Sequence, residues 1–262
     1  MDTNIKLVID KISIELDGKN VLKELSFDVK DGEILSILGP SGSGKTTLLR
    51  ILIGLLKPNS GKIIKDGEDI TNFLSSQRKM GMVFQDYALF ENMTVLENIE
   101  YALISKKKNR NIENKKIIRS KAIELIELLG LKNHINKNVT KLSGGEAQRV
   151  AICRTLMLNP EIILWDEPMS ALDASNRLIL RQEIVNIQKI YKTTMIYVTH
   201  DQEEAFSISQ RIMVMNAGKV IQIGSPKELI NNYRNEFINE FVIKNLINKY
   251  SLLKNVVEDI NK

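Results

Sequence analysis

A glycine-rich segment near the N-terminus combines the residue types that hold phosphate groups. The sequence LGPSGSGKTTL at residues 38–48 matches the pattern Gly39-x4-Gly44-Lys45-Thr46, between an apolar run and a helix-like stretch at residues 47–56. Glycines let backbone N–H groups turn inward, and the positive end of the following helix favours anions. Lys45 would reach the β- and γ-phosphates, and the Thr46 hydroxyl would bind Mg²⁺. The predicted nucleotide-binding residues of this loop are Gly39, Pro40, Ser41, Gly42, Ser43, Gly44, Lys45, Thr46 and Thr47.

The alternative for this segment is a glycine-rich turn with a chance Lys-Thr pair. The apolar run before it and the helical pattern after it are the context in which the pattern carries meaning. Both flanks favour nucleotide binding.

Two neighbouring carboxylates supply what a metal-dependent hydrolysis needs. The sequence IILWDEP at residues 162–168 is a buried-strand pattern that ends in Asp166 and Glu167. Ligands bind at the carboxyl ends of parallel strands, so Asp166 would hold Mg²⁺ directly or through water. Glu167 would take a proton from an attacking water. The alternative is that the two acids simply begin a helix.

A second glycine-rich segment lies between the phosphate loop and the carboxylate pair. The octapeptide LSGGEAQR at residues 142–149 places Ser143, Gly144 and Gly145 directly before a helical pattern. The start of a helix is able to bind an anion.

This octapeptide resembles the signature motif of ATP-binding cassette (ABC) ATPases, and further family motifs follow at the family's spacing. Gln85 in VFQDYALF resembles the glutamine loop, SALD at residues 170–173 resembles the D-loop, and His200 in IYVTHD resembles the switch histidine. Histidines at strand ends are more often structural, and only the VTHDQEEA context favours a catalytic one. The resemblance covers about residues 5–235 and implies a RecA-like P-loop NTPase core that binds and hydrolyses ATP.

The resemblance also implies how the sites are assembled. In the family, two protomers form a head-to-tail homodimer with two ATP molecules between them, and the signature of one protomer closes over the ATP of the other. Ser143 and Gly145 would then contact the γ-phosphate in trans, and Asp173 would cross the dimer interface. Gln85 would sense Mg²⁺ and the attacking water, and His200 would donate a hydrogen bond to the γ-phosphate.

The segment DYALFENMTVLENIEYAL resembles importer ATPases of the polyamine, ferric iron, sulfate and sugar group. This resemblance implies membrane permease subunits as partners, a solute-binding protein as an indirect partner, and a peripheral place on the cytoplasmic face of the membrane. The alternatives are the cassette of an exporter or an ABC ATPase outside transport. Many relatives carry a β-rich C-terminal domain, whereas only about 35 residues follow Pro226 here and they are helical in pattern.

One expected residue is missing. The family usually stacks an aromatic side chain on adenine near the first hairpin, where this chain has Leu16. Losing the ring would cost about 0.5–1.5 kcal/mol of stacking, which predicts weak ATP affinity.

The elements that must position these residues follow from the hydrophobic pattern. Uniformly apolar runs at residues 34–38, 162–165, 195–198 and 212–215 are typical of a parallel sheet covered on both faces. Helical patterns alternate with them, as at residues 118–129 and 178–191, which predicts an α/β fold. Alternating segments at residues 6–16 and 21–29, around Asp17-Gly18, and a shorter pair at residues 58–70 predict a small antiparallel sheet.

Two regions fall outside this α/β pattern. Residues from about 86 to 158 carry almost no strand signal and predict an inserted helical subdomain. The cassette domain is predicted to span residues 1–235. An amphipathic helical tail follows at residues 236–262, and it would pack on its own domain; a contact with a partner is the alternative.

Composition narrows the class of protein. The chain has 262 residues and a net charge of +5, with 43% hydrophobic residues. The charge is too mild and too dispersed to favour a nucleic-acid partner, and the basic run at residues 106–110 is interpreted as a solvated loop. The single cysteine, Cys153, excludes an internal disulfide. No apolar run approaches the roughly 18–20 residues of a membrane span, so membrane association is expected through partners.

Overall fold

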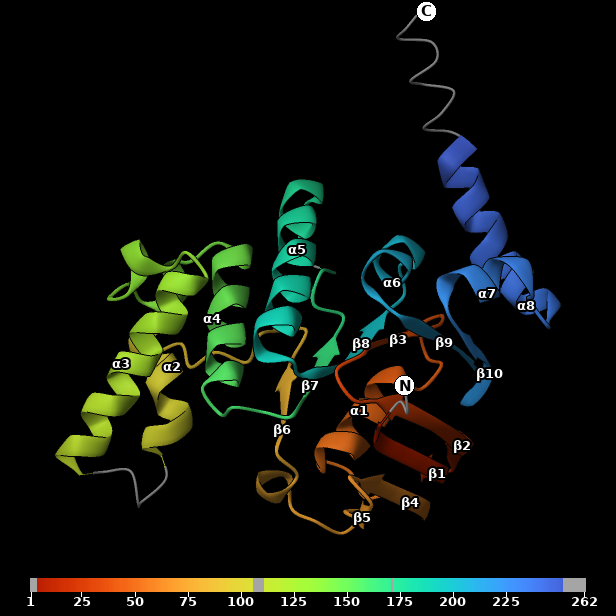
Figure 1. Ribbon diagram of the computed structural model, residues 1–262, viewed down its shortest axis with the longest axis horizontal. Coiled ribbons are helices and arrows are strands. Elements are labelled where there is room, and N and C mark those ends of the chain that lie inside the picture. Colours follow the sequence, from red (N-terminus) through yellow and green to blue (C-terminus); the bar gives the residue numbers. More distant parts are fainter. Residues whose placement is uncertain (1–3, 106–110, 171, 252–262) are drawn as a thin grey trace, which may run out of the picture. The chain divides into compact units, whose positions relative to one another are not determined.

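The computed structural model describes residues 4–105, 111–170 and 172–251. It divides the chain into two compact units, one made of residues 1–52, 56–71 and 197–262 and the other of residues 53–55 and 72–196 (Figure 1). The larger sheet has the strand order β10-β9-β3-β8-β7-β6, and a smaller sheet has the order β2-β1-β4-β5. The predicted α/β fold is confirmed.

The first unit begins with the small antiparallel sheet. Its strands are β1 (Ile5–Leu16), β2 (Lys19–Lys30), β4 (Ser60–Lys65) and β5 (Glu68–Asp69). The hairpin between β1 and β2 turns at Asp17 and Gly18, with φ angles of 49° and 72°, as the Asp-Gly pair predicts. β4 pairs with β1 in antiparallel register, so the two predicted hairpins share one sheet.

The other strands of the first unit position the phosphate loop. β3 (Ile34–Leu38) is buried along its whole length and pairs with β9 (Arg211–Asn216) in parallel. β10 (Lys219–Gly224) runs antiparallel to β9. α1 (Lys45–Ile53) follows β3 directly. The burial of β3 is as its largely apolar sequence predicted, and its polar Ser36 shares a hydrogen bond with the Ser209 hydroxyl.

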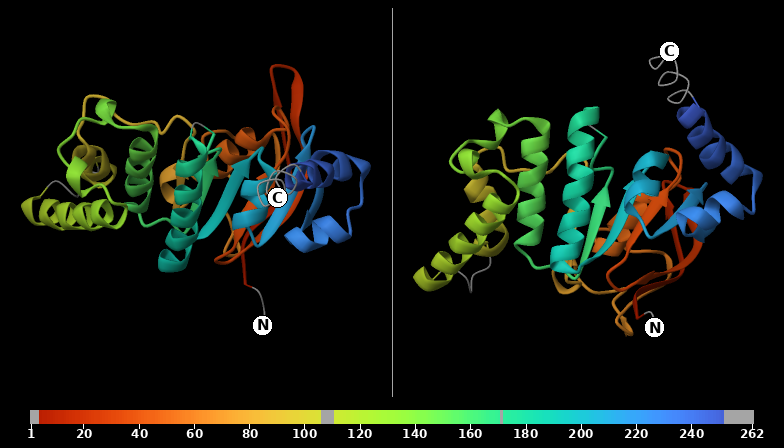
Figure 2. Two further views of the ribbon diagram at one scale, coloured as in Figure 1. Left: turned by 90° about the horizontal axis from the view of Figure 1, so that it is seen from above. Right: turned by 45° about the horizontal axis from the view of Figure 1, so that its top comes forward.

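The C-terminal segment belongs to the first unit. It contains α7 (Pro226–Asn231), α8 (Glu236–Ile238) and a π-helical stretch, η5 (Asn239–Lys244); α6 (Gln202–Ile208) comes earlier, between β8 and β9. Ile238 and Val242 are fully buried in one cluster with Leu38 of β3 and Val214 of β9. Figure 2 shows this helical segment beside β10 from two directions. Residues 236–251 thus pack on their own unit, and residues 252–262 lie outside the described part of the chain.

The second unit is mainly helical. β6 (Met80–Val83) and β7 (Ile162–Asp166) pair in parallel, and β8 (Thr194–Thr199) begins in this unit. Between β6 and β7, the described residues form helices and no named strand. These helices are α2 (Val95–Ile104), α3 (Ile112–Leu128) and α4 (Gly144–Leu156), with short 3₁₀ turns η3 (Lys132–His134) and η4 (Val139–Lys141). α5 (Ala174–Tyr191) follows β7, and η1 (Ser75–Gln77) precedes β6.

Two helices start earlier than the hydrophobic pattern predicts. α3 begins at Ile112 rather than Ile118, because Asn111 caps it by accepting a hydrogen bond from the Asn114 N–H. α5 likewise begins at Ala174 rather than Leu178. Within the described ranges, no helix combines the length and the apolar character that crossing a membrane requires.

Candidate active site

The phosphate loop joins β3 to α1 in the first unit, and packing requires glycine at two of its positions, Gly39 and Gly44. A Cβ at Gly39 would lie 2.4 Å from the Met215 carbonyl oxygen, and one at Gly44 would lie 2.6 Å from Leu22 Cδ2. Gly42 and Gly44 also have φ angles of 77° and 99°, which residues with a Cβ rarely adopt. Any larger residue at Gly39 or Gly44 would therefore displace the loop.

The polar groups of the loop point to an anionic ligand. The Lys45 ammonium is 5% exposed and donates hydrogen bonds to the carbonyls of Gly39 and Pro40 at 2.8 and 3.1 Å. The Ser43 hydroxyl oxygen is buried and has no hydrogen-bond partner among the described residues. The first turn of α1 contains no acidic residue. A buried cation, a buried polar group and a positive helix end fit the phosphates of a nucleotide.

His200 also lies in the first unit, where hydrogen bonds fix the turn that carries it. It is exposed and stands between the end of β8 and Asp201, which caps α6. The Asp201 carboxylate accepts hydrogen bonds from the Glu203 and Glu204 N–H groups at 2.7 and 3.2 Å. The buried Glu204 carboxylate accepts hydrogen bonds from the hydroxyls of Tyr197 and Thr199 at 2.9 and 2.7 Å. This network holds the backbone on both sides of the histidine.

The two predicted carboxylates lie together at the end of β7 in the second unit. Asp166 is 5% exposed, and Glu167 is half-buried with a φ of 45°. Neither residue begins a helix, because the N-cap of α5 is Asp173. The structure thereby removes the alternative that the two acids serve as a cap. A non-glycine residue with positive φ at a strand end is a strained position of the kind that clusters at functional sites.

One serine links Gln85 to the carboxylate pair. Its side-chain amide donates a hydrogen bond to the Ser170 hydroxyl at 3.4 Å, and that hydroxyl donates one to the Glu167 carbonyl at 2.9 Å. Gln85, two residues after β6, and Glu167, directly after β7, are therefore linked within the second unit. Sequence analysis placed Ser170 in the SALD segment without a separate role; Ala171 of that segment lies outside the described residues.

The signature segment forms the start of α4. Ser143 is the N-cap, with its hydroxyl accepting a hydrogen bond from the Glu146 N–H and Glu146 accepting one from the Ser143 N–H at 2.8 Å. That backbone hydrogen bond, with the nearby Lys137 ammonium at 3.8 Å and His134, lowers the pKa of Glu146. The negative charge of Glu146 is thus partly balanced before any anion approaches the helix.

The glycines of the signature differ from those of the phosphate loop. A Cβ at Gly144 or Gly145 would meet its nearest atoms at 3.8 and 3.6 Å, ordinary contact distances, and neither residue has a positive φ. Glycine in a helix costs about 1 kcal/mol relative to alanine. Within the described residues, packing does not require glycine at these two positions. A group that approached this helix start closely from outside the chain would require it, because a Cβ would be in the way.

Asp173 has a structural role in this chain. Its carboxylate accepts hydrogen bonds from the Ser175 hydroxyl at 2.6 Å, the Asn176 N–H at 2.9 Å and the Asn176 side-chain amide at 2.6 Å. These bonds, led by that from Ser175, lower the pKa of Asp173 well below its ordinary value. The side chain is exposed, so it remains open to a partner as well.

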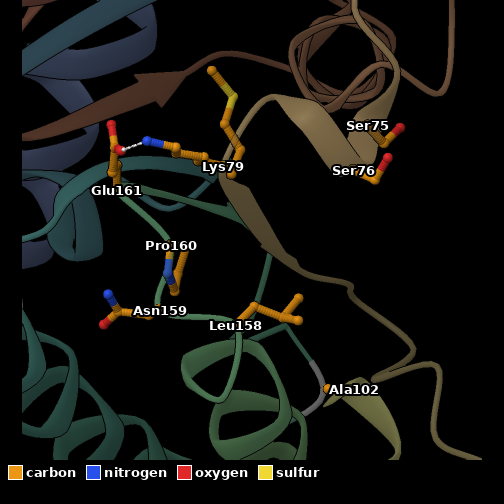
Figure 3. A pocket seen from close by; sticks show the side chains of 9 residues that line it. Ser75, Ser76, Lys79, Ala102, Leu158, Asn159, Pro160 and Glu161 are labelled. Carbon is orange, nitrogen blue, oxygen red and sulfur yellow. Dashed lines mark ion pairs between the residues drawn. The ribbon is translucent and has the colours of Figure 1, made fainter. Parts of the chain in front are cut away.

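Leu16, predicted to replace an adenine-stacking ring, is the last residue of β1 and is 36% exposed. Two hollows of the second unit border α2. One, of ≈570 Å³, lies between η1, α2 and the residues after α4, and the ion pair of Lys79 and Glu161 at 3.0 Å lies at its edge (Figure 3). The other, of ≈380 Å³, lies along α2. Sequence analysis gave no signal for the first, because its lining comes from separate short segments.

Comparison with known proteins decides the family. The family model described as ABC transporter matches residues 22–170. The chain belongs to the ABC transporter family. The P-loop NTPase fold and the general function predicted from the sequence, an ATP-hydrolysing cassette of an importer, are confirmed by this match and by the relatives below.

Several relatives are named importer subunits. The chain is 42% identical over 242 residues to the spermidine/putrescine import ATP-binding protein PotA of Mycoplasma capricolum, covering 92% of this chain and 67% of the relative. It is 42% identical over 234 residues to the Fe(3+) ions import ATP-binding protein FbpC of Photorhabdus laumondii, covering 89% of this chain and 65% of that protein.

Solved structures show the same fold. CbiO1 of Clostridium perfringens, described as part of the ABC transporter complex CbiONQ, aligns with a TM-score of 0.79 and 28% identity over 97% of this chain and 99% of that one. A dimeric ATP-binding cassette bound to ADP and phosphate, described as a post-hydrolysis state, aligns with a TM-score of 0.73 and 32% identity over 84% of this chain and 98% of that one.

Proposed function

We propose that two copies of this chain form a head-to-tail homodimer in which each of two Mg²⁺-dependent ATP sites is built from both copies. The observation that supports this proposal is that the glycines of the two segments have different surroundings. Gly39 and Gly44 of the phosphate loop are required by the packing of the chain itself, whereas Gly144 and Gly145 are exposed or half-exposed and the described residues give no reason for glycine there. A phosphate held by a second copy supplies that reason.

Each residue has a role that its surroundings support. Lys45 and the backbone of the loop bind the β- and γ-phosphates of ATP, and Ser143 with Gly145 contacts the γ-phosphate of the ATP held by the partner copy. Glu167 accepts the proton of the attacking water, which Gln85 and His200 orient or stabilise. Asp173 reaches the partner copy across the dimer interface. It does so with the part of its exposed carboxylate that is not used in capping α5.

Magnesium fits the residues present. Thr46, Asp166 and Gln85 offer the oxygen ligands that Mg²⁺ prefers, and Mg²⁺ uses one or two carboxylates together with phosphate oxygens. The described part of the chain contains no cluster of three or more metal-ligating His, Cys, Asp or Glu side chains, which agrees with a metal that is held mainly by its nucleotide. When bound, the ion neutralises charge that develops on the phosphates.

The surface along α2 supports coupling to a permease. The ≈380 Å³ hollow there combines apolar Met93, Tyr101 and Ile104 with the carboxylates of Glu97 and Glu100. An amphipathic helix with basic residues fits such a groove, because its apolar side covers the floor and its charges meet the carboxylates. We propose that a cytoplasmic helix of a permease docks here and thereby holds the chain at the cytoplasmic face of the membrane, with a solute-binding protein acting on the permease. The names of the relatives make polyamines and ferric iron the first solutes to assay.

Mixing two inactive variants tests the shared site. Lys45→Ala and Ser143→Arg homodimers should each hydrolyse ATP poorly. A mixture should recover about one quarter of the wild-type rate, since random pairing makes half of the dimers mixed and each mixed dimer keeps one complete site. The matched control mixes Lys45→Ala with Glu167→Gln, which damages both sites of every mixed dimer and should recover nothing. Absence of recovery in the first mixture, with both variants folded, would rule out sites built from two copies.

A further inference from the structure

The segment after Gln85 passes through two consecutive strained residues. Tyr87 and Ala88 have φ angles of 61° and 46°, in the left-handed region. Neither is glycine, and a Cβ makes this region unfavourable for each of them. A pair of such residues persists only where the surrounding structure holds it.

One arginine of the signature helix donates hydrogen bonds to both carbonyls of this pair, in addition to the backbone hydrogen bond from the Tyr87 N–H to the Phe84 carbonyl at 3.1 Å. The Arg154 guanidinium donates one hydrogen bond to the Ala88 carbonyl at 2.5 Å and a second to the Tyr87 carbonyl at 2.8 Å. It also lies over the Phe90 ring, 5.6 Å from its centroid. Only the planar fork of an arginine reaches two carbonyls and a ring face in this way; a lysine presents a point charge.

The opposite end of the same helix touches the segment as well. The Tyr87 hydroxyl is buried without a hydrogen-bond partner among the described residues, and it lies 3.8 Å from where a Cβ of Gly144 would be. Burial raises the pKa of Tyr87, so its hydroxyl is neutral. Arg154 lies in the last turn of α4 and Gly144 in its first, so the helix is hydrogen-bonded to the strained pair at one end and lies close to the Tyr87 hydroxyl at the other.

The aromatic contact extends this connection to α2. Phe90 packs on Tyr101 with ring centroids 4.5 Å apart, and Tyr101 lines the hollow along α2. A displacement of α4 would therefore act on Gln85 through the backbone of residues 85–88 and on the α2 surface through Phe90.

We propose that Arg154 is a positioning residue that holds residues 85–90 in a strained conformation and so makes the placement of Gln85 depend on the signature helix. While both carbonyls are bound, the segment stays left-handed at Tyr87 and Ala88. When α4 moves far enough to break one bond, the segment relaxes and Gln85 leaves its place beside Ser170. This inference rests on the proposed function only for the role of Gln85 in hydrolysis.

The strain itself is tested by a glycine substitution that needs no activity. Glycine adopts a positive φ without steric cost, so Ala88→Gly should raise the melting temperature of the full chain by about 1–4 °C. Ala102→Gly is the matched control: Ala102 lies within α2, where glycine weakens a helix and should lower the melting temperature. A lower melting temperature for Ala88→Gly would overturn the inference.

The positioning role is tested by rescue. Arg154→Met should lower kcat for ATP about 10- to 100-fold, with KM changed less than about twofold, because the variant misplaces Gln85 without touching the phosphate loop. Adding Ala88→Gly should restore most of the rate, since glycine at position 88 adopts the positive φ without the two hydrogen bonds from Arg154. Arg149→Met is the control: Arg149, on the same helix, pairs with Glu183 at 2.9 Å, and Ala88→Gly should not rescue it.

Failure of rescue, or an unchanged kcat in Arg154→Met, would overturn the inference. If Arg154→Met does not fold, Arg154→Lys carries the same comparison, with a smaller loss that Ala88→Gly again restores. If the wild-type chain and its mixed dimers do not hydrolyse ATP, the proposed function fails, while the melting temperature of Ala88→Gly still decides whether the segment is strained.

Discussion

At the scale of single residues, the two glycine-rich segments show that one residue type serves two purposes. Gly39 and Gly44 are fixed by neighbours inside the chain, at distances a Cβ would not tolerate. A Cβ at Gly144 would meet its nearest atoms at 3.8 Å, an ordinary contact distance, so packing within the described residues does not require glycine there. A sequence motif names both kinds of glycine alike, and only the surrounding atoms separate them.

This difference yields a paired prediction. Gly44→Ala places a Cβ 2.6 Å from Leu22 Cδ2 at a φ of 99°, so the loop must shift. We expect loss of ATP binding and a melting temperature lower by several degrees, since positive-φ strain and overpacking each cost about 1–3 kcal/mol. Gly145→Ala is the control, because its Cβ meets Asn176 at 3.6 Å. It should keep the fold and single-copy ATP binding and lose turnover at least tenfold.

Nucleotide titration, thermal unfolding and steady-state hydrolysis on both variants check the pair. Equal behaviour of the two variants in ATP binding would contradict the distinction between the segments.

At the scale of elements, strands were predictable where burial on both faces gave them a nearly continuous run of apolar residues. β3, β7, β8 and β9 are buried along most or all of their length, and the largely apolar run within each was found from its pattern. β6 was missed, because it has only four residues and contains Gly81. That glycine is explained only by structure: a Cβ there would lie 2.5 Å from Thr155 Cγ2.

Helix starts and turns depend on polar contacts that periodicity does not record. α3 begins at a cap supplied by Asn111, before its buried residues begin at Ile118. An aspartate directly before a helical run predicts a cap, as Asp173 is for α5. The family resemblance instead implied a role for Asp173 at the dimer interface. The left-handed Tyr87 and Ala88 had no signal, because neither residue type favours that conformation.

The Asp173 cap predicts how the stability of α5 depends on pH. Hydrogen bonds from Ser175 and Asn176 lower the pKa of this carboxyl in the folded chain, below its unfolded value of about 3.9. Its stabilising effect is therefore complete above about pH 5 and is lost as pH falls through the lower folded pKa. Asp173→Asn should reduce the melting temperature near neutral pH, and the gap to wild type should shrink steadily below about pH 4.

Thermal unfolding from pH 7 to pH 3 measures this gap. Glu203→Gln is a suitable comparison: its exposed carboxylate has an ion pair with Lys249 at 3.4 Å, and surface pairs contribute little. A gap that stays constant over the whole range would show that the carboxylate charge of Asp173 is not what stabilises the helix.

At the scale of the whole molecule, the C-terminal segment is tied to the turn that carries His200. The Gln202 side-chain amide donates a hydrogen bond to the Phe241 carbonyl at 3.0 Å, and Lys249 lies 3.6 Å from Asp201 and 3.4 Å from Glu203. Both acids belong to the cap and first turn of α6, directly after the histidine. The expected amphipathic tail thus braces, within its own unit, the turn that carries the proposed catalytic histidine.

The apolar contacts below these polar ones carry the last prediction. Val242 is fully buried with Leu38, Ala205 and Ile238, so an aspartate there would place an unpaired charge in the cluster that supports α6 and β3. Val242→Asp should destabilise the chain by at least about 3 kcal/mol and lower the rate of ATP hydrolysis, because the turn that carries His200 loses its support. Lys244→Asp, two positions on and exposed, is the control and should change the melting temperature little. Thermal unfolding measures the lost stability, and ATP hydrolysis at a temperature where both variants are folded measures the lost positioning. A Val242→Asp chain that is destabilised yet hydrolyses at the wild-type rate would mean that the C-terminal segment supports the fold but not the histidine.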